Sequence, residues 1–378
     1  MQKITIVSAA YPLRGGIAHF AGLLFNELNK YFDVNVITFK RQYPSLLFPG
    51  KSQLEHGDSV EKIPSDVILD SINPFNWIKI GKKIRDLEPD LLILKYWMPF
   101  FAPAYGVISR IVKKNGKTKI LAICHNVIPH EKKPGDIALS KFFFSSVDYF
   151  ILLSDSVKDD LLSIVNEPKF KVLFHPIYSN FGNSISKIEA KQYLKIKEER
   201  VLLFFGFIRD YKGLDVLLEA LAILKVQLKF KLIIAGEFYS NEGKYVKLID
   251  ELKLQDYVIL YNDFIPQEEV KYYFSACDVV VLPYKSATQS GIVQIANNFI
   301  KPMISTNVGG LGEVIKDGET GYLVEKENPQ KLADAISKYY KENKEKDFSD
   351  NIGIEREKYS WSVFVKEMME LTEEKKTA

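Results

Sequence analysis

The chain has 378 residues, of which 47% are hydrophobic and 26% are charged, and its formal net charge at pH 7 is +3. A chain of that length exceeds what one hydrophobic core usually supports, so we expect two domains of roughly 180 residues each. Its two cysteines provide neither a disulfide framework nor a metal site, and we expect reduced core thiols.

The amino-terminal sequence lacks the long apolar segment of a signal peptide, and no apolar stretch approaches the roughly 20 residues that span a bilayer. We therefore expect a cytoplasmic protein. Residues 1–180 contain 23 Lys and Arg against 17 Asp and Glu, a net charge of +6. This excess lies within normal scatter, but it would also suit peripheral binding to an anionic membrane surface or to a phosphorylated lipid acceptor.

Short apolar runs alternate with amphipathic segments over the first half of the chain. Near-continuous runs of Ile, Leu and Val are typical of strands covered on both faces, as in a parallel sheet. Strands are predicted at residues 4–7, 34–37, 91–94, 120–124, 149–153 and 171–174, and helices at 17–29, 77–87, 105–114 and 157–165. This alternation favours βαβ units and a first Rossmann-like domain at residues 1–178.

The segment 175–186 has the turn composition of a linker, and the alternation then restarts in a second Rossmann-like domain at 186–358. Strands are predicted at 201–205, 231–235, 258–260, 279–282 and 303–305, and helices at 214–225, 244–252, 267–275, after Gly291, at 329–342 and at 361–374. The predicted class is α/β, with two doubly wound domains that face each other across a cleft. Ligands of such sheets bind at the carboxyl ends of the strands.

The first candidate site is a pair of glycines after the first strand. The sequence contains no P-loop, and no Gly-x-Gly-x-x-Gly motif follows that strand. Gly15 and Gly16 instead form a turn that opens a helix. Adjacent glycines allow the backbone to approach a ligand, and the helix N–H groups can bind an anion. A tight strand–helix connection would account for the same pair.

Two further candidate sites follow strands of the second domain. Arg209 and Lys212 lie three residues apart after strand 201–205, a pattern that suits a diphosphate but also a solvated basic loop. Ser290 and Gly291 open a helix whose N–H groups could hold a phosphate, although Ser290 could serve only as an N-cap. Both loops leave the same edge of one predicted sheet, which favours the functional interpretation.

The whole chain resembles the retaining glycosyltransferases of family 4, the group 1 glycosyltransferases with the GT-B fold. The resemblance rests on an ordered series of short motifs over about residues 4 to 365. They are Gly15-Gly16, His125-Asn126-Val127, Pro129-His130-Glu131, Gly206-Phe207-Ile208-Arg209, Lys212-Gly213, Ala235-Gly236-Glu237, Ala276-Cys277-Asp278-Val279, Val308-Gly309-Gly310 with Glu313, and Asp317-Gly318-Glu319-Thr320-Gly321. The last helix, at 360–375, resembles the family helix that crosses back onto the first domain.

The resemblance implies transfer of a hexose from a UDP- or GDP-linked sugar to a hydroxyl acceptor, with retention at the anomeric carbon. The acceptor would be a sugar or a lipid-linked sugar of bacterial surface polysaccharide or glycolipid synthesis. The nucleotide sugar would be a co-substrate, and no cofactor, metal ion or nucleic-acid partner is expected. A peripheral position at the inner face of the plasma membrane would suit a lipid-linked acceptor.

The resemblance also implies roles for individual residues. Arg209 and Lys212 would bind the donor diphosphate and stabilise it as it leaves, with the amides of Ser290 and Gly291 beside them. From the first domain, the Gly15-Gly16 turn would approach the donor, and His125 would hydrogen-bond the transferred sugar. His130 and Glu131 would be acceptor-side or structural residues.

One departure from the family pattern concerns two glutamates that the family usually carries eight positions apart. Ala287 and Ile295 occupy the equivalent positions, which leaves the contacts to the donor ribose open. Gln289 and Gln294 are the nearest polar candidates for donor contacts. The departure keeps two alternatives open: a non-catalytic paralogue with the same fold, or another GT-B enzyme such as a sugar-nucleotide epimerase or a phosphorylase.

Overall fold

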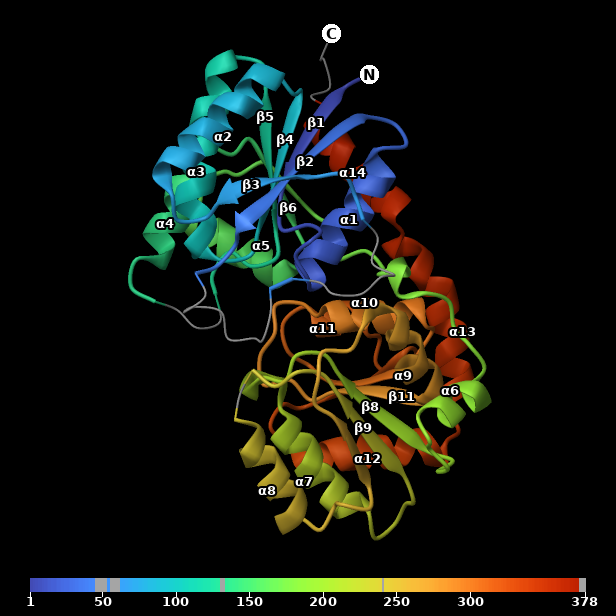
Figure 1. Cartoon of the computed structure of the whole chain (residues 1–378). Helices are drawn as coiled ribbons and strands as arrows, with labels where there is room; N and C mark the ends of the chain where they lie inside the picture. Colours follow the sequence, from blue (N-terminus) through green and yellow to red (C-terminus); the bar gives the residue numbers. More distant parts are fainter. Residues whose placement is uncertain (45–52, 55–61, 130–132, 240, 374–378) are drawn as a thin grey trace. The chain divides into compact units, whose positions relative to one another are not determined.

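The computed structural model describes residues 1–44, 53–54, 62–129, 133–239 and 241–373. These residues form two compact units (Figure 1). The first unit contains the described residues up to Pro176 together with those from Tyr359 onward, and the second contains residues 177–358. No helix among the described residues is long and apolar enough to cross a bilayer. Both cysteines, Cys124 and Cys277, are buried and unpaired.

The first unit is built on a parallel sheet with the strand order β3-β2-β1-β4-β5-β6-β7. Every residue of the central strand β4 is buried, which explains its continuous apolar sequence. The strands are β1 (Lys3–Val7), β2 (Asp33–Arg41), β3 (Asp66–Asp70), β4 (Leu91–Tyr96), β5 (Lys119–Cys124), β6 (Tyr149–Leu152) and β7 (Phe170–Val172).

Helices cover both faces of this sheet. They are α1 (Gly16–Leu28), α2 (Pro74–Leu87), α3 (Ala102–Val112), α4 (Asp136–Phe144), α5 (Asp155–Ile164) and α14 (Trp361–Thr372). Figure 1 shows α2, α3 and α4 together on one face and α1 with α14 on the other. The final helix α14 packs against α1, β6 and β7, and Lys171 of β7 forms ion pairs with Glu367 and Glu370 of α14.

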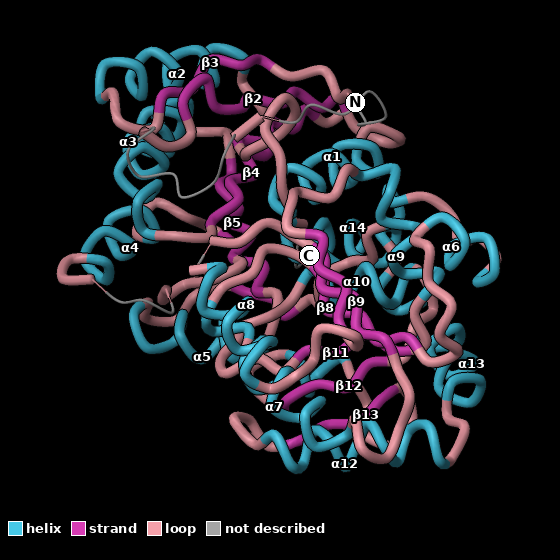
Figure 2. Tube along the Cα trace, turned by 60° about the horizontal axis from the view of Figure 1, so that its bottom comes forward, coloured by secondary structure: helices cyan, strands magenta, loops and turns pink. Residues whose placement is uncertain are grey.

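The second unit contains a parallel sheet with the order β10-β9-β8-β11-β12-β13, whose strands lie side by side in Figure 2. Helices α7, α8 and α12 cover one face, and α9 and α10 cover the other. The strands are β8 (Val201–Phe205), β9 (Lys231–Ala235), β10 (Val258–Tyr261), β11 (Val279–Leu282), β12 (Met303–Thr306) and β13 (Gly321–Val324). The helices are α6 (Lys187–Tyr193), α7 (Leu214–Leu224), α8 (Glu242–Glu251), α9 (Val270–Ala276), α10 (Gly291–Asn298), α11 (Leu311–Val314), α12 (Pro329–Lys341) and α13 (Glu345–Glu355).

The α/β class with two doubly wound parallel sheets is confirmed, but the sequence analysis missed several elements. These are β3, β13, α4, α6, α11 and α13. The helix α4 lacks a regular apolar stripe, because Ile137, Leu139 and Phe142 are exposed while Ser140 is buried. The edge strand β3 buries only its last two residues, Leu69 and Asp70. Neither segment therefore shows the periodicity on which the predictions relied.

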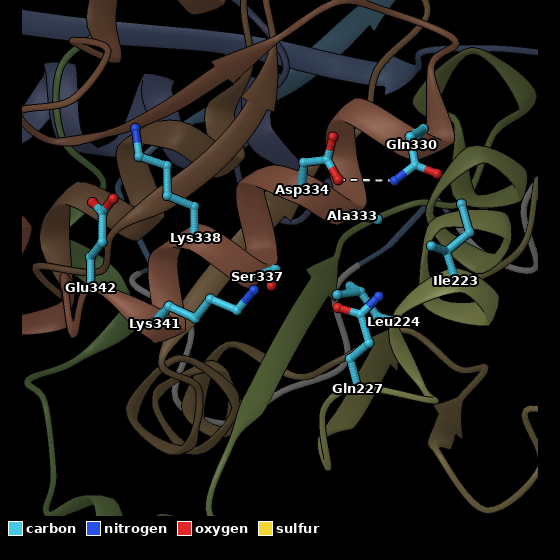
Figure 3. Close-up of a pocket in the computed structure, with 10 residues that line it drawn as sticks. All are labelled: Ile223, Leu224, Gln227, Gln330, Ala333, Asp334, Ser337, Lys338, Lys341 and Glu342. Carbon is cyan, nitrogen blue, oxygen red and sulfur yellow. Dashed lines mark hydrogen bonds between the residues drawn. The ribbon is translucent and has the colours of Figure 1, made fainter.

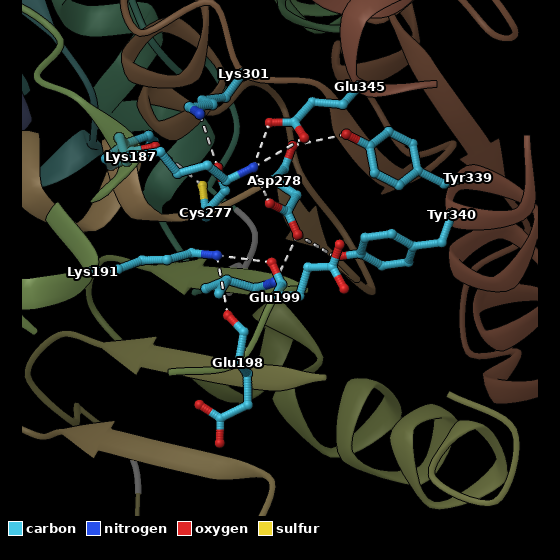
Figure 4. Close-up of polar contacts among 12 residues, drawn as sticks. Lys187, Lys191, Glu198, Glu199, Cys277, Asp278, Lys301, Tyr339, Tyr340 and Glu345 are labelled. Atoms are coloured by element: carbon cyan, nitrogen blue, oxygen red, sulfur yellow. Dashed lines mark hydrogen bonds and ion pairs between the residues drawn. The ribbon is translucent and has the colours of Figure 1, made fainter. Parts of the chain in front are cut away.

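A network of polar contacts joins several elements at the amino-terminal edge of the second sheet (Figure 4). Lys187 of α6 forms ion pairs with Asp278, which precedes β11, and with Glu345 of α13 at 2.8 Å. Asp278 is buried and accepts hydrogen bonds from the backbone N–H of Val201 at 2.7 Å and the hydroxyl of Tyr340 at 3.0 Å. This network is structural, because it lies at the edge opposite the carboxyl ends of the strands.

The strand order reverses direction at one point in each sheet. In the first sheet β1 lies between β2 and β4, and in the second β8 lies between β9 and β11. The connections from the two neighbouring strands then leave towards opposite faces, which opens a crevice at their carboxyl ends. The segments that follow β1, β4, β8 and β11 are therefore where each unit is best shaped to bind a ligand.

Candidate functional site

The loop that joins β8 to α7 carries the two predicted phosphate-binding cations. It leaves the strand at Gly206, and the N–H of Ile208 donates to the carbonyl of Glu237 at 2.9 Å. The loop ends in a 3-10 turn at Asp210–Lys212, in which the N–H of Lys212 donates to the carbonyl of Arg209 at 3.0 Å. Arg209 and Lys212 thus lie on one tight loop at the switch point of the second sheet.

The two cations have different surroundings. Arg209 is exposed, and its guanidinium lies 5.1 Å from the ring centroid of Tyr239. The side chain of Lys212 is buried, with its Nζ 5.7 Å from the ring centroid of Tyr284. Burial, helped by the charge of Arg209, lowers the pKa of Lys212 to about 7. Within the described part of the chain neither cation forms an ion pair with a carboxylate.

The loop that joins β11 to α10 carries the predicted helix-terminus site. Ser290 is the N-cap of α10: its hydroxyl accepts a hydrogen bond from the N–H of Ile292 at 3.3 Å and lies 3.3 Å from the hydroxyl of Tyr284. The first turn of α10, which begins at Gly291, has no acidic side chain. The positive end of the helix dipole is therefore not compensated by a carboxylate of that turn.

These two loops are held together by direct backbone contacts. The N–H of Lys285 donates to the carbonyl of Tyr211 at 2.7 Å. Gly213, with φ +69°, lies so close to Pro283 that an added Cβ would be 1.9 Å from its carbonyl oxygen. Only glycine fits there, because both the backbone conformation and the space exclude a side chain. The contact fixes the Arg209–Lys212 loop against the loop that leads to Ser290.

We expect Gly213→Ala to destabilise the second unit by about 3 kcal/mol or more, because the new methyl group must displace the Pro283 carbonyl. Gly116→Ala is the matched control, since Gly116 has φ +68° but open space around its Cβ position. It should cost only about 1 kcal/mol. Urea unfolding of both variants measures the difference, and equal losses would show that the close approach at Pro283 is unimportant.

Two cavities of the second unit lie in different places. One of about 820 Å³ borders the β11–α10 loop through Lys285, Ser286 and Ala287. The other, of about 310 Å³, lies between α7 and α12, where Gln330 donates to Asp334 at 2.9 Å (Figure 3). None of the predicted site residues lines this second cavity, so we assign it no role in the site.

The two glutamine candidates are placed differently. Gln289 is half-buried in the loop beside Ser290. Gln294 is buried within α10, where its side-chain oxygen accepts a hydrogen bond from Asn297 at 3.3 Å. Ala287 lies in the loop and Ile295 is buried in the helix, so neither supplies a polar group at the family's glutamate positions. Among the described residues no cluster of His, Cys, Asp and Glu could hold a metal ion.

In the first unit, the Gly15-Gly16 turn directly precedes α1. Gly15 has φ +98°, and a Cβ added there would meet no atom within 4 Å, so the backbone conformation and not the lack of space calls for glycine. Gly16 is exposed and begins the helix, whose first turn has no acidic side chain. The turn therefore places two residues without side chains and the positive end of a helix at the switch point of the first sheet.

His125 follows β5, one strand away from that switch point. Its backbone N–H donates to the carbonyl of Tyr96 at 2.8 Å, and its side chain is buried. Burial, together with the charges of Lys95 and His175, lowers the pKa of His125 well below its usual range, so the imidazole is neutral at pH 7. His130 and Glu131 lie outside the described residues.

The sequence analysis did not identify Lys95 and His175 as neighbours of His125. Lys95 is the one charged residue in the apolar run of β4, and that irregularity is the only signal that could have revealed it. His175 falls in the segment interpreted as a linker, where no pattern distinguishes it. Their approach to His125 depends on the order of the strands, which the sequence alone does not specify.

The sequence is similar to known glycosyltransferases. Residues 186–354 match the family described as "Glycosyl transferases group 1". An uncharacterized glycosyltransferase of Methanocaldococcus jannaschii is 25% identical over 406 residues, covering 99% of each chain.

Solved structures share the fold of the whole chain. Sucrose-phosphate synthase from Thermosynechococcus elongatus has a TM-score of 0.76 at 18% identity, over 98% of each chain. Anabaena HepE in complex with UDP has a TM-score of 0.76 at 17% identity, over 98% of this chain and 99% of its own. The chain thus has the GT-B fold, and its residues 186–354 are similar to the group 1 glycosyltransferases.

Proposed function

We propose that the chain is a retaining glycosyltransferase that moves a hexose from a nucleoside-diphosphate sugar to a hydroxyl acceptor. The observation that carries this proposal is the loop after β8, where Arg209 and Lys212 lie together without a described ion pair, fixed against the start of α10. The structural neighbour HepE was solved with UDP and with UDP-glucose, which makes a UDP-linked sugar the first donor to test before GDP-linked sugars.

The proposed chemistry relies on electrostatic stabilisation of the leaving group. The acceptor oxygen bonds to the anomeric carbon while the bond from that carbon to the diphosphate breaks, and the electron pair leaves with the diphosphate. The acceptor proton passes to the departing phosphate oxygen. Arg209 binds the diphosphate with its forked guanidinium, Lys212 binds it as a point charge, and the amides of Ser290 and Gly291 complete the set.

In this proposal the first unit contacts the sugar and the acceptor. The Gly15-Gly16 turn approaches the donor through the exposed Gly16, and the neutral imidazole of His125 hydrogen-bonds a sugar hydroxyl. Gln289, which lies next to the N-cap of α10, is the nearer candidate for a donor contact, and Gln294 is the second. The nucleotide sugar serves as co-substrate, and the proposed reaction uses no metal ion.

The pH dependence of donor binding tests the role of Lys212. Lys212 has a pKa of about 7 in the free protein, and a bound diphosphate raises it. The affinity for UDP-glucose is therefore highest below pH 7, where Lys212 is protonated. Above pH 7 the protein must take up a proton to bind, so we expect the Kd to rise by up to about tenfold per pH unit.

Isothermal titration calorimetry from pH 6 to pH 9 measures this change. Lys212→Met should bind weakly at every pH and lose the pH dependence. Lys225→Met is the control, since Lys225 donates to the carbonyl of Lys253 and should keep the wild-type profile. A Kd of the wild-type protein that does not change with pH would contradict the role of Lys212. Tight binding without turnover would instead favour the non-catalytic paralogue.

We also propose that the acceptor is lipid-linked, in bacterial surface polysaccharide or glycolipid synthesis, and that the first unit contacts the membrane from the cytoplasmic side. The exposed side of α2 supports this proposal. Phe75 and Ile78 are 84% and 41% exposed, and Lys79 and Lys82 continue the same helical stripe. Apolar and basic side chains on one exposed stripe suit the interface of an anionic bilayer.

Vesicle binding tests the proposed membrane contact. We expect the protein to sediment with vesicles that contain anionic phospholipid and to be released by high salt, because charge attraction is screened. Phe75→Ser should weaken binding several-fold, since it removes the most exposed apolar side chain of the stripe. Ile188→Ser, which changes an exposed residue of the second unit, is the control. Equal binding of both variants would contradict the contact.

A further inference from the structure

Lys95 is a fully buried lysine in the centre of the first sheet. Its side chain has no exposed surface, and it lies on β4 among apolar residues. Its Nζ donates to the carbonyl of Ile17 at 3.3 Å and lies 3.4 Å from the ring centroid of Phe20. Among the described residues no carboxylate pairs with it. Burial of a lysine without an acidic partner lowers the free energy of unfolding, so we expect a role that offsets this loss of stability.

The ring of Phe20 gathers further basic groups around this lysine. It makes edge-on contacts with the imidazole of His125 at a centroid distance of 5.2 Å and with that of His175 at 5.0 Å. The two imidazoles lie 5.8 Å from each other. Trp361 of α14 closes the cluster at 4.9 Å from Phe20. One aromatic ring is thus in contact with three basic side chains, all of them buried.

The elements packed around this cluster carry a further basic group, and their described carboxylates pair with other lysines. From α1 comes His19, whose pKa burial lowers to about 4. The carboxylates of α1 and α14 are engaged elsewhere: Glu27 pairs with Lys30 at 2.6 Å, and Glu367 and Glu370 pair with Lys171. The segment after β7 contributes His175, and β5 leads into His125.

Basic groups that share an apolar site cannot all hold a proton. Burial lowers the pKa of Lys95 well below its usual value, and it lowers that of His175 to about 3. The charge of Lys95 acts on both imidazoles in the same direction as burial. Because an amine is intrinsically far more basic than an imidazole, Lys95 is the first group of this cluster to take up a proton as the pH falls, and its charge then opposes protonation of His125 and His175.

We propose that Lys95 is a positioning residue for the ligand site of the first unit: it acts on His125 by its charge and on the Gly15-Gly16 turn by its hydrogen bond to Ile17. Ile17 directly follows the turn, so the amine links β4 to the first residues of α1. The charge of Lys95 opposes protonation of the His125 ring to an imidazolium. A neutral imidazole therefore faces the sugar. Only this last consequence rests on the proposed function.

Two substitutions separate the charge from the hydrogen bond. Lys95→Gln removes the charge but keeps a donor for the carbonyl of Ile17, whereas Lys95→Met removes both. If Lys95 acts on His125 through its charge, the two variants change His125 alike. If Lys95 only fills space or satisfies the carbonyl, Lys95→Gln leaves His125 unchanged.

The decisive readout is the NMR titration of the histidine Cε1–H signals, which needs no substrate. The chain has five histidines, so single His→Gln replacements assign each signal. We expect the pKa of His125 to rise by one unit or more in both Lys95 variants. Lys113→Met, which removes a lysine paired with Asp148 in the same unit, is the control and should leave it unchanged. An unchanged His125 titration in Lys95→Gln would overturn the proposal.

A second measurement needs no variant at all, in case the substituted proteins do not fold. In the wild-type protein, deprotonation of Lys95 should shift the His125 signal with the same midpoint as the Lys95 Cε signal. A His125 signal that is flat through that titration would contradict the proposal.

Turnover separates this inference from the proposed function. If the protein cleaves UDP-glucose, the pH profile of kcat/KM should change in both Lys95 variants. Its acid limb should move to higher pH by as much as the pKa of His125 rises. If it cleaves no nucleotide sugar, the proposed function fails while the two titrations still decide the role of Lys95.

Discussion

Positive charge that no described carboxylate neutralises is the feature on which both candidate sites depend. In each parallel sheet the strand order reverses beside the first strand, and helices begin in the connections that leave this point. In the second unit this place holds Arg209 and Lys212, and in the first it holds Lys95 beneath the Gly15-Gly16 turn. No described carboxylate pairs with these cations, which costs stability, and in the second unit the proposed diphosphate would supply the missing partner of Arg209 and Lys212.

Burial lowers the pKa of both Lys212 and Lys95, but the two lysines have different roles in the proposed account. Lys212 lies on a loop close to Arg209, and its lowered pKa would allow it to take up a proton on binding the proposed diphosphate. Lys95 lies inside the sheet under Phe20, so no ligand reaches it directly, and it acts through the groups around it. In the proposed account Lys212 responds to the ligand directly, whereas Lys95 acts on the residues that would contact it.

The sequence alone predicted the α/β class, most strands and the loops that carry Arg209, Lys212 and Ser290, because these follow from local patterns of apolar runs and their ends. It did not predict the cluster around Lys95, since a single lysine in a buried strand gives no information on what packs against it. Contacts of that kind depend on the order of strands in the sheet. Short elements such as β3 and α4 were missed because their buried positions do not follow a regular period.

The most direct test of the account is a thermal-shift panel of UDP-, GDP-, ADP- and dTDP-linked sugars on the wild-type protein and on Arg209→Ala. We predict stabilisation by one nucleotide class, about 2.7 kcal/mol at 100 times the Kd, and its loss in Arg209→Ala. Arg200→Ala is the matched control, because Arg200 also lies over a tyrosine ring, that of Tyr340, but at the opposite edge of the sheet. No shift with any donor, or an equal shift in Arg209→Ala, would contradict the diphosphate site.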